Sequence, residues 1–391
     1  MNIQPRILLA IVVSIVTGII LGVTIDLKLH SKNSGSKEGK FVLDMDAFES
    51  IVKRIGDSYV TPLDEEAMLR DAVKGVLRGL DKHSVYLGKK AWAKLKSQST
   101  GQFGGVGIKL TIDAGKLKVV NPISNTPAER AGILPGDILV HIDQKLVKKN
   151  ALELALAALR GKPGTAVSLG IERANQNEAL EFDLIRAAIG VSSVRSRWLG
   201  DFAYVRVSQF QVDTGLEAIK SIETMLADPV HKMQGLILDL RGNSGGVLQA
   251  SVELADAFLS EGKIVYTEGR RSSSDVKYNA SATDILDGLP IAVLINKGSA
   301  SASEIVAGAL QDHGRAVLMG SKSYGKGSVQ TVMPLRNEHA IKLTTALYYT
   351  PNGRAINDVG LVPDILITPE GDQDYLDVVL EEFSKAIPRE S

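Results

Sequence analysis

Two loops of small residues carry groups that could perform acyl-transfer chemistry. Residues 298–304 contain three serines and follow an apolar run at 291–295, and residues 241–246 are rich in glycine and follow an apolar run at 236–240. Each loop leads into a predicted helix, whose first N–H groups are free to bind an anion or a developing oxyanion. A serine of the first loop is therefore a candidate nucleophile.

The same residues also have a purely structural interpretation. Ser301 and Glu304 precede an apolar stretch with the spacing of a capping box, in which the serine only satisfies helix N–H groups. A glycine-rich segment after a strand is commonly no more than a turn. Spacing alone therefore does not establish catalysis at either loop.

Lys326 favours the catalytic interpretation. It lies between Gly325 and Gly327, just after the apolar run 316–319. If the side chain is desolvated, its pKa falls, and the neutral amine could take the serine proton and return it to a leaving amine. A solvated loop lysine is the simpler alternative. Lys322 is a second candidate in the same loop, although the flanking glycines favour Lys326.

These loops need a rigid support, and the pattern between them predicts one. The runs 236–240, 291–295 and 316–319 are almost continuously apolar, and helical patterns at 247–259 and 303–312 separate them. Such runs indicate a parallel sheet that is covered on both faces. The ends of its strands meet at one edge, where ligands of such sheets bind. We therefore expect a layered α/β core over residues 190–370.

Together these residues resemble the carboxyl-terminal processing peptidases, also called tail-specific proteases, over roughly residues 41–370. Residues 299–304 are similar to the nucleophile motif of that family and residues 325–330 to its general-base motif. Three further motifs are similar as well: the oxyanion loop at 239–246, a helical-region signature at 80–87, and the strand and turn at 343–346 and 348–354. The resemblance implies a multi-domain α/β protein with a crotonase/ClpP-like peptidase core that cleaves proteins near or from their C-terminal tails.

The resemblance also implies a role for individual residues. Ser301 would be the nucleophile, Lys326 the base, and Gln330 the residue that orients the lysine. The oxyanion would be bound by N–H groups of Gly245 or Gly246 and of Ala302. The family pattern implies no metal, nucleotide or other cofactor. This chain departs from that pattern at residues 321–322 and at Leu347, which concerns the base loop and the substrate channel.

Residues 101–189 contain short strands and two short helices, which predicts a compact β-rich module. The resemblance identifies this module as a PDZ domain, although the glycine-rich bend alone would also fit an ordinary β domain. Successive N–H groups after Phe103 could hold a terminal carboxylate, and a peptide could add as a strand beside residues 106–112. The expected peptide-binding residues are Gly104, Gly105, Val106, Gly107, Ile108, Leu152 and Leu156.

The N-terminus predicts attachment to a membrane. Residues 7–25 carry no charge and are almost long enough to span a bilayer, so we expect a signal-anchor helix over 1–30 and a linker over 31–40. The alternative is a cleaved signal peptide, for which residues 23–25 match poorly. The lysines that follow the span would leave the body in the cytoplasm. The family resemblance instead implies a bacterial inner-membrane protein with its catalytic body in the periplasm, or a soluble periplasmic protein after cleavage.

The amino-acid composition argues against nucleic acid and metal ions as binding partners. The 391 residues include 45 basic and 45 acidic side chains, so no net field favours nucleic acid. Cysteine is absent, and the six histidines are scattered singly, without metal-ligand spacing. We expect protein substrates with apolar, unstructured tails. A helical subdomain at 41–100 and a C-terminal helix at 371–391 could pair two copies into a homodimer, and an activating adaptor could also bind.

Two other functions fit parts of the pattern. The chain could be a catalytically silent, PDZ-containing scaffold that only binds tails, in which case Ser301 would be dispensable. It could also be an acyl-CoA hydrolase or isomerase on a similar layered core, which predicts binding of coenzyme A. The PDZ-like insertion and the 299–304 motif argue against the latter.

Overall fold

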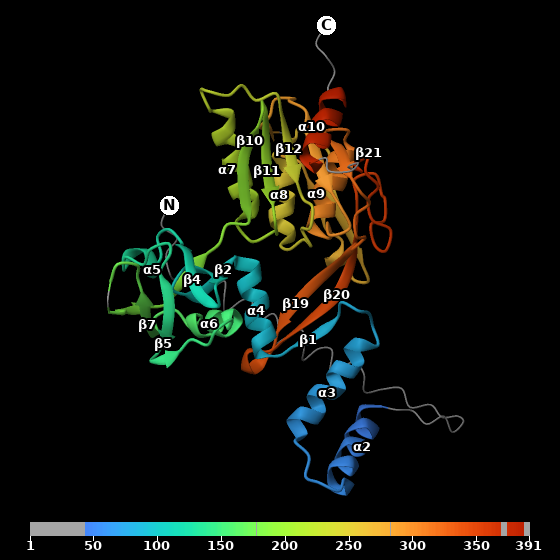
Figure 1. The fold of residues 1–391 in the computed structure, drawn as a ribbon. Helices are drawn as coiled ribbons and strands as arrows, with labels where there is room; N and C mark the ends of the chain where they lie inside the picture. The colour runs from blue at the N-terminus through green and yellow to red at the C-terminus, as the bar shows by residue number, and fades with distance from the viewer. Residues whose placement is uncertain (1–43, 177, 282, 369–373, 387–391) are drawn as a thin grey trace, which may run out of the picture. The chain divides into compact units, whose positions relative to one another are not determined.

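The computed structural model describes residues 44–176, 178–281, 283–368 and 374–386 (Figure 1). The chain divides after Asp71 into two compact units, which are described separately. The predicted anchor at 1–30 and the linker at 31–40 lie outside the described residues. Within the described part, no helix combines the length and the hydropathy that crossing a bilayer requires.

The first unit is a short helical segment. Helix α2 (Met45–Ser58) begins after Asp44, whose carboxylate accepts a hydrogen bond from the Ala47 N–H at 2.8 Å. Helix α3 (Glu65–Arg78) begins in this unit and ends in the second. None of the residues of α2 is buried.

The second unit is built on a six-stranded sheet with the order β10-β11-β12-β17-β18-β21. From β11 onward neighbouring strands are parallel, and β10 pairs antiparallel to β11. Every residue of β12 and β17 is buried, which confirms the predicted sheet with two covered faces. The strands are β10 (Val194–Leu199), β11 (Phe202–Val207), β12 (Gly235–Asp239), β17 (Ile291–Ile295), β18 (Val317–Gly320) and β21 (Ile365–Leu366).

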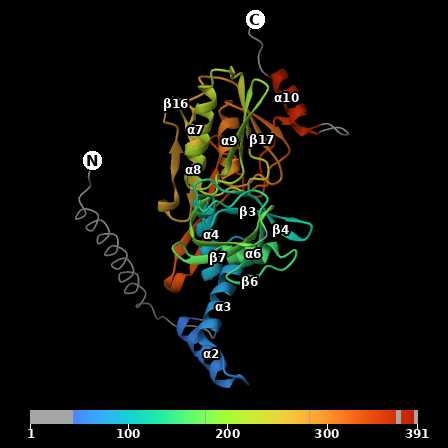
Figure 2. The same cartoon turned by 60° about the vertical axis from the view of Figure 1, so that its left-hand side comes forward.

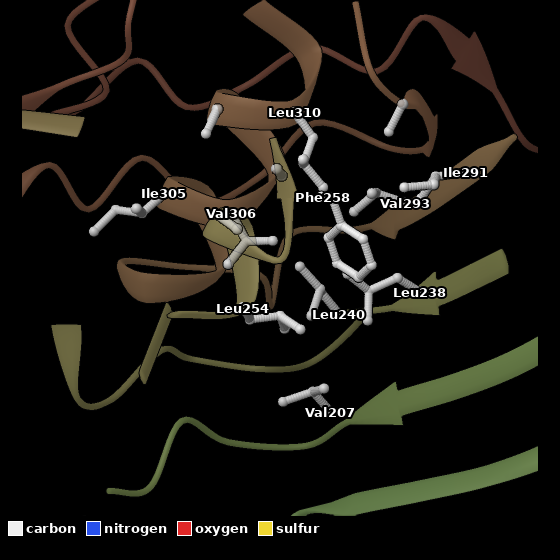
Figure 3. Close-up of a cluster of buried hydrophobic side chains, with 14 of the residues drawn as sticks. Val207, Leu238, Leu240, Leu254, Phe258, Ile291, Val293, Ile305, Val306 and Leu310 are labelled. Atoms are coloured by element: carbon white, nitrogen blue, oxygen red, sulfur yellow. The ribbon is translucent and has the colours of Figure 1, made fainter. Parts of the chain in front are cut away.

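Helices cover both faces of this sheet. On one face α8 (Leu248–Asp256) lies between α7 (Thr214–Leu226) and α9 (Ala302–Asp312) in Figure 1, and Figure 2 shows the same three helices after a turn of 60°. Leu238 and Leu240 point into this layer, where they pack in one apolar cluster with residues of α8 and α9 (Figure 3). The other face carries α10 (Tyr375–Ala386), whose Phe383 packs in a second cluster with Ile237. Successive side chains of β12 point to opposite faces of the sheet, so they pack into two separate apolar cores.

A second, five-stranded sheet lies in the same unit, with the order β1-β20-β14-β15 and β19 paired to β20. Its strands are β1 (Val85–Leu87), β14 (Lys263–Gly269), β15 (Lys277–Asn279), β19 (Ser328–Pro334) and β20 (Ala340–Tyr349). The predicted helical subdomain at 41–100 therefore also contains a strand, because β1 pairs with β20 through Val85 and Lys342. Helix α4 (Lys89–Thr100) follows β1, and a short two-stranded pair joins β13 (Phe258–Leu259) to β16 (Thr283–Asp284).

Residues 102–190 form the β-rich module. Its antiparallel sheet has the order β3-β4-β5-β7-β8, with β6 paired to β5, and it encloses its own apolar core. A separate ribbon pairs β2 with β9. The elements are β2 (Gln102–Gly105), β3 (Ile108–Asp113), β4 (Lys116–Pro122), α5 (Pro127–Arg130), β5 (Ile138–Ile142), β6 (Lys145–Leu146), α6 (Leu152–Leu159), β7 (Ala166–Glu172), β8 (Leu180–Ile185) and β9 (Ala187–Gly190).

Candidate active site

The loops predicted to carry chemistry follow three adjacent parallel strands. β17 lies between β12 and β18, so the ends of all three strands meet at one edge of the sheet. A cavity of about 720 Å³ at this edge is lined by Ser301, Lys326 and Gln330. The three predicted oxyanion residues line it as well: Gly245, Gly246 and Ala302. Residues that are far apart in sequence are thereby brought to one site.

The three serines of the 298–304 loop have different roles. Ser299 and Ser303 are fully buried, and their hydroxyls donate to the carbonyls of Leu240 at 2.8 Å and Asn243 at 2.9 Å. These bonds fasten the loop to the end of β12. Ser301 is only half-buried, and it lines the cavity. The middle serine is therefore the one whose side chain faces space for a substrate.

Ser301 occupies an unusual backbone conformation. It is the N-cap of α9, with φ 58° and ψ −116°, a region that residues other than glycine rarely adopt. Such strain persists only where the surroundings enforce it. Gly245 supplies part of that enforcement, since an added Cβ there would lie 2.7 Å from the Ser301 Cβ and 3.0 Å from the Ala302 nitrogen. The two loops are thus in direct backbone contact.

Glu304 ties the serine turn to the lysine loop. Its side chain is fully buried, and one oxygen accepts from the N–H groups of Ser301 at 2.8 Å and Lys326 at 2.9 Å. The other oxygen accepts from the Ser323 hydroxyl at 2.6 Å and the Gly325 N–H at 2.7 Å. The sequence pattern indicated only a helix cap, and the burial of Glu304 turns that cap into a link between two loops.

Lys326 is placed as a base would be. Burial lowers the pKa of its ammonium, the nearby Lys342 lowers it further, and Glu304 opposes both effects. Lys342 lines the same cavity, whereas Lys322 is exposed and does not line it. The flanking Gly327 packs closely, because a Cβ there would lie 2.3 Å from the Asn357 nitrogen. The geometry therefore favours Lys326 over Lys322 as the cavity's amine.

Gln330 and Tyr348 are the polar neighbours of this pair. The Gln330 Nε2 donates to the Thr344 hydroxyl at 3.0 Å and the Ser328 hydroxyl at 3.2 Å, while its buried Oε1 has no partner among the described residues. The Tyr348 hydroxyl donates to the Lys326 carbonyl, and Tyr348 lines the cavity together with Ser301. Burial raises the pKa of Tyr348, so its phenol remains protonated. No motif in the sequence predicted this role for Tyr348.

The glycine loop and the start of α9 each offer one free backbone donor. The Gly245 N–H already donates to the Asn243 Oδ1 at 2.9 Å, and the buried Asn243 also donates to the Val207 carbonyl. The N–H groups of Gly246 and Ala302 have no acceptor within the part of the chain that the structure describes. These two groups are therefore available to an oxyanion.

A buried ion pair holds the start of this loop. The Arg241 guanidinium donates to both oxygens of Asp239, at 2.9 and 2.7 Å, and lies 4.1 Å from the ring centroid of Tyr375. Burial alone would raise the pKa of Asp239, but hydrogen bonds from Arg241 and the Tyr204 hydroxyl hold it below its usual value. The sequence analysis did not predict this ion pair. Neither of its residues lines the cavity.

The predicted peptide-binding residues lie apart from this cavity. Gly104 and Gly105 end β2, Val106 and Gly107 form the connection, and Ile108 begins β3. Leu152 and Leu156 lie on α6, which packs beside β3. Within the described residues β3 pairs only with β4, so its other edge is open to an added strand.

Comparisons with known proteins show which families the chain is similar to. Residues 201–367 match peptidase family S41, and residues 104–184 match the PDZ domain. The carboxy-terminal-processing protease of Bartonella bacilliformis is 43% identical over 341 residues, which cover 86% of this chain and 78% of that protein. The carboxy-terminal processing protease CtpB of Bacillus subtilis is 33% identical over 328 residues, 83% of this chain and 68% of that protein. Among solved structures, the photosystem II D1 C-terminal processing protease is 28% identical, with a TM-score of 0.49 and coverage of 83% and 87%.

Proposed function

The chain belongs to peptidase family S41, among the carboxy-terminal processing proteases, and from this premise we propose that it is a serine endopeptidase in which Ser301 and Lys326 form the catalytic pair. The observation that carries the proposal is the contrast between the three loop serines. Two have hydroxyls bound to backbone carbonyls, and the third lines a cavity together with a half-buried lysine.

The proposed reaction uses groups that the cavity already holds. Neutral Lys326 accepts the proton of the Ser301 hydroxyl as its Oγ attacks the scissile carbonyl. The N–H groups of Gly246 and Ala302 bind the oxyanion, each worth about 3–4 kcal/mol. Protonated Lys326 then gives its proton to the leaving amine, and water hydrolyses the acyl-enzyme in the same way. The free Gln330 Oε1 can accept from the lysine and hold it in place.

We further propose that the PDZ domain selects the substrate. An extended C-terminal tail would add to the open edge of β3, with its side chains against Leu152 and Leu156. Main-chain hydrogen bonds would supply affinity, and the apolar helix face would favour apolar tail residues. This arrangement would supply substrates to a cavity whose own walls include Trp92, Leu95 and Val329.

The test uses the purified full chain with a loosely folded protein that ends in an apolar tail. Cleavage is followed by intact mass for the wild type, Ser301→Ala, Lys326→Ala and Lys322→Ala. We expect cleavage by the wild type and Lys322→Ala and none by the other two. Loss in Lys322→Ala but not in Lys326→Ala would reassign the base. Tail binding by the wild type without any cleavage would support a scaffold protein instead.

A further inference from the structure

The segment between α3 and β1 is connected to Gln330, beside the proposed catalytic pair, through hydrogen bonds. Asp81 accepts from the backbone N–H groups of His83 at 2.6 Å and Ser84 at 2.8 Å, and from the Ser84 hydroxyl at 2.8 Å. Ser84 is almost fully buried, and its Oγ accepts from the Thr344 N–H at 3.1 Å. The pairing of β1 with β20 holds these residues beside one another.

Thr344 connects this segment to Gln330. Its hydroxyl oxygen lies at hydrogen-bond distance from the Ser84 hydroxyl, at 3.4 Å, and accepts from the Gln330 Nε2 at 3.0 Å. Asp81, Ser84, Thr344 and Gln330 thus form one continuous series of hydrogen bonds, which we call the Asp81 chain. It ends at the Gln330 Oε1, which is buried and has no partner among the described residues.

The hydrogen bonds of the Asp81 chain all run in one direction, from the donor Gln330 to the acceptor Asp81. Burial would raise the pKa of Asp81, but its hydrogen bonds from Ser84, His83 and Thr344 lower it to about 2, so the carboxylate only accepts hydrogen bonds at neutral pH. The Ser84 hydroxyl gives its single proton to Asp81, so the Thr344 hydroxyl directs its own proton toward the Ser84 oxygen. The Thr344 oxygen is left to accept, so Gln330 must present its NH₂ group to Thr344.

An amide whose NH₂ group is fixed has its carbonyl oxygen fixed on the opposite side. We infer that Asp81 is a positioning residue for the proposed general base: through Ser84 and Thr344 it holds the Gln330 carbonyl toward Lys326. This inference rests on the proposed function of Lys326. Gln330 and Lys326 line the same cavity, where a carbonyl can accept a hydrogen bond from the amine, whereas a reversed amide would point N–H groups at it.

The decisive variant allows the donor-to-acceptor direction of the hydrogen bonds in the Asp81 chain to reverse, while the size and shape of the side chain stay the same. Asp81→Asn can donate as well as accept, so the two hydroxyls can turn around and Gln330 can flip. N–H groups would then face Lys326 and destabilise its ammonium. We expect kcat to fall roughly tenfold with KM unchanged. The acid-limb midpoint of the kcat profile should move down by about half a pH unit.

Thr344→Val and Thr345→Val provide a matched pair. They make the same change at neighbouring positions of β20, but the Thr345 hydroxyl pairs with Thr331 and not with Gln330. Thr344→Val should resemble Asp81→Asn, Thr344→Ser should restore both kcat and the midpoint, and Thr345→Val should behave as the wild type. A general loss of stability would lower the yield of active protein in all of them without moving the midpoint.

A double-mutant cycle shows whether the chain acts through Gln330. Asp81→Asn should cost roughly tenfold in the wild type but less than about twofold in Gln330→Ala. Equal costs in both backgrounds, or an unmoved midpoint in Asp81→Asn, would overturn the inference while the Ser-Lys proposal stands. Cleavage of the same tailed substrate by Ser301→Ala would overturn the proposed function, and the inference with it.

Discussion

The parallel sheet and the PDZ sheet of this chain differ in where the proposed functional groups lie: at the ends of strands in the first and along the edge of a strand in the second. The parallel sheet uses the ends of its central strands, where β12, β17 and β18 deliver the 241–246, 298–304 and 321–327 loops. In the PDZ sheet, the proposed binding surface is the open side of the edge strand β3. The proposed catalytic groups thus lie on loops that are joined by buried hydrogen bonds, whereas the proposed recognition surface lies where backbone groups are left unpaired.

The parallel-sheet core and the PDZ domain should therefore respond differently to amino-acid substitution. The proposed catalytic groups are individual side chains held by Ser299, Ser303 and Glu304, so single changes should have large and specific effects. A groove that binds mainly through backbone hydrogen bonds should tolerate side-chain changes better.

The largest expected effect is at Ser301. Ser301→Ala should reduce kcat at least about a thousandfold because no other hydroxyl can replace the nucleophile. Binding of an apolar tail to the PDZ domain should be unchanged, as measured by fluorescence anisotropy. Ser303→Ala is the matched control, and it should retain cleavage within roughly tenfold, since its hydroxyl only donates to the Asn243 carbonyl. Equal losses in both variants would contradict the distinction between the loop serines.

Glu304→Gln should have the next largest effect. The amide would direct N–H groups at donors that the carboxylate now satisfies, which should lower the free energy of unfolding by roughly 2–4 kcal/mol. Because Glu304 holds both loops, kcat should fall about a hundredfold even in the fraction that stays folded. Urea unfolding and active-site titration separate the two effects. The exposed Glu268→Gln serves as the control and should change neither.

A smaller effect is expected in the PDZ groove. Leu156→Asp should raise KM about tenfold for a substrate with an apolar tail, because it puts a charge beside the proposed binding strand. The value of kcat should change little. Leu154 lies on the same helix but is 67% exposed, so Leu154→Asp is the control. An equal rise in KM for both variants, or for a substrate without the tail, would argue against recognition at α6.

The smallest effect concerns pH. Lys326 must be neutral to act, so activity should rise as the pH increases through its lowered pKa. Lys342→Met removes a positive charge that disfavours the ammonium, so the pKa of Lys326 should rise. The midpoint of the kcat/KM profile should then move up by roughly half a unit to one unit. Lys322→Met should leave the midpoint unchanged, and a downward shift in Lys342→Met would contradict the assignment of Lys326.

The sequence predicted the parts of the site that depend on local pattern. The apolar runs predicted the buried strands, and the small residues after them predicted the loops that line the cavity. It could not predict the role of Glu304, because a capping box describes contacts within one helix turn and not the bonds to Ser323 and Gly325. Strand β1 was missed for a similar reason: its three residues pair with a strand more than 250 positions away.

The Glu304 carboxylate has a consequence for how the site opens. The N–H groups of Ser301, Gly325 and Lys326 all donate to this one side chain. Their amide hydrogens cannot exchange with solvent until Glu304 releases them, so the nucleophile turn and the base loop should exchange as one cooperative unit. The two halves of the catalytic pair would then be assembled or lost together.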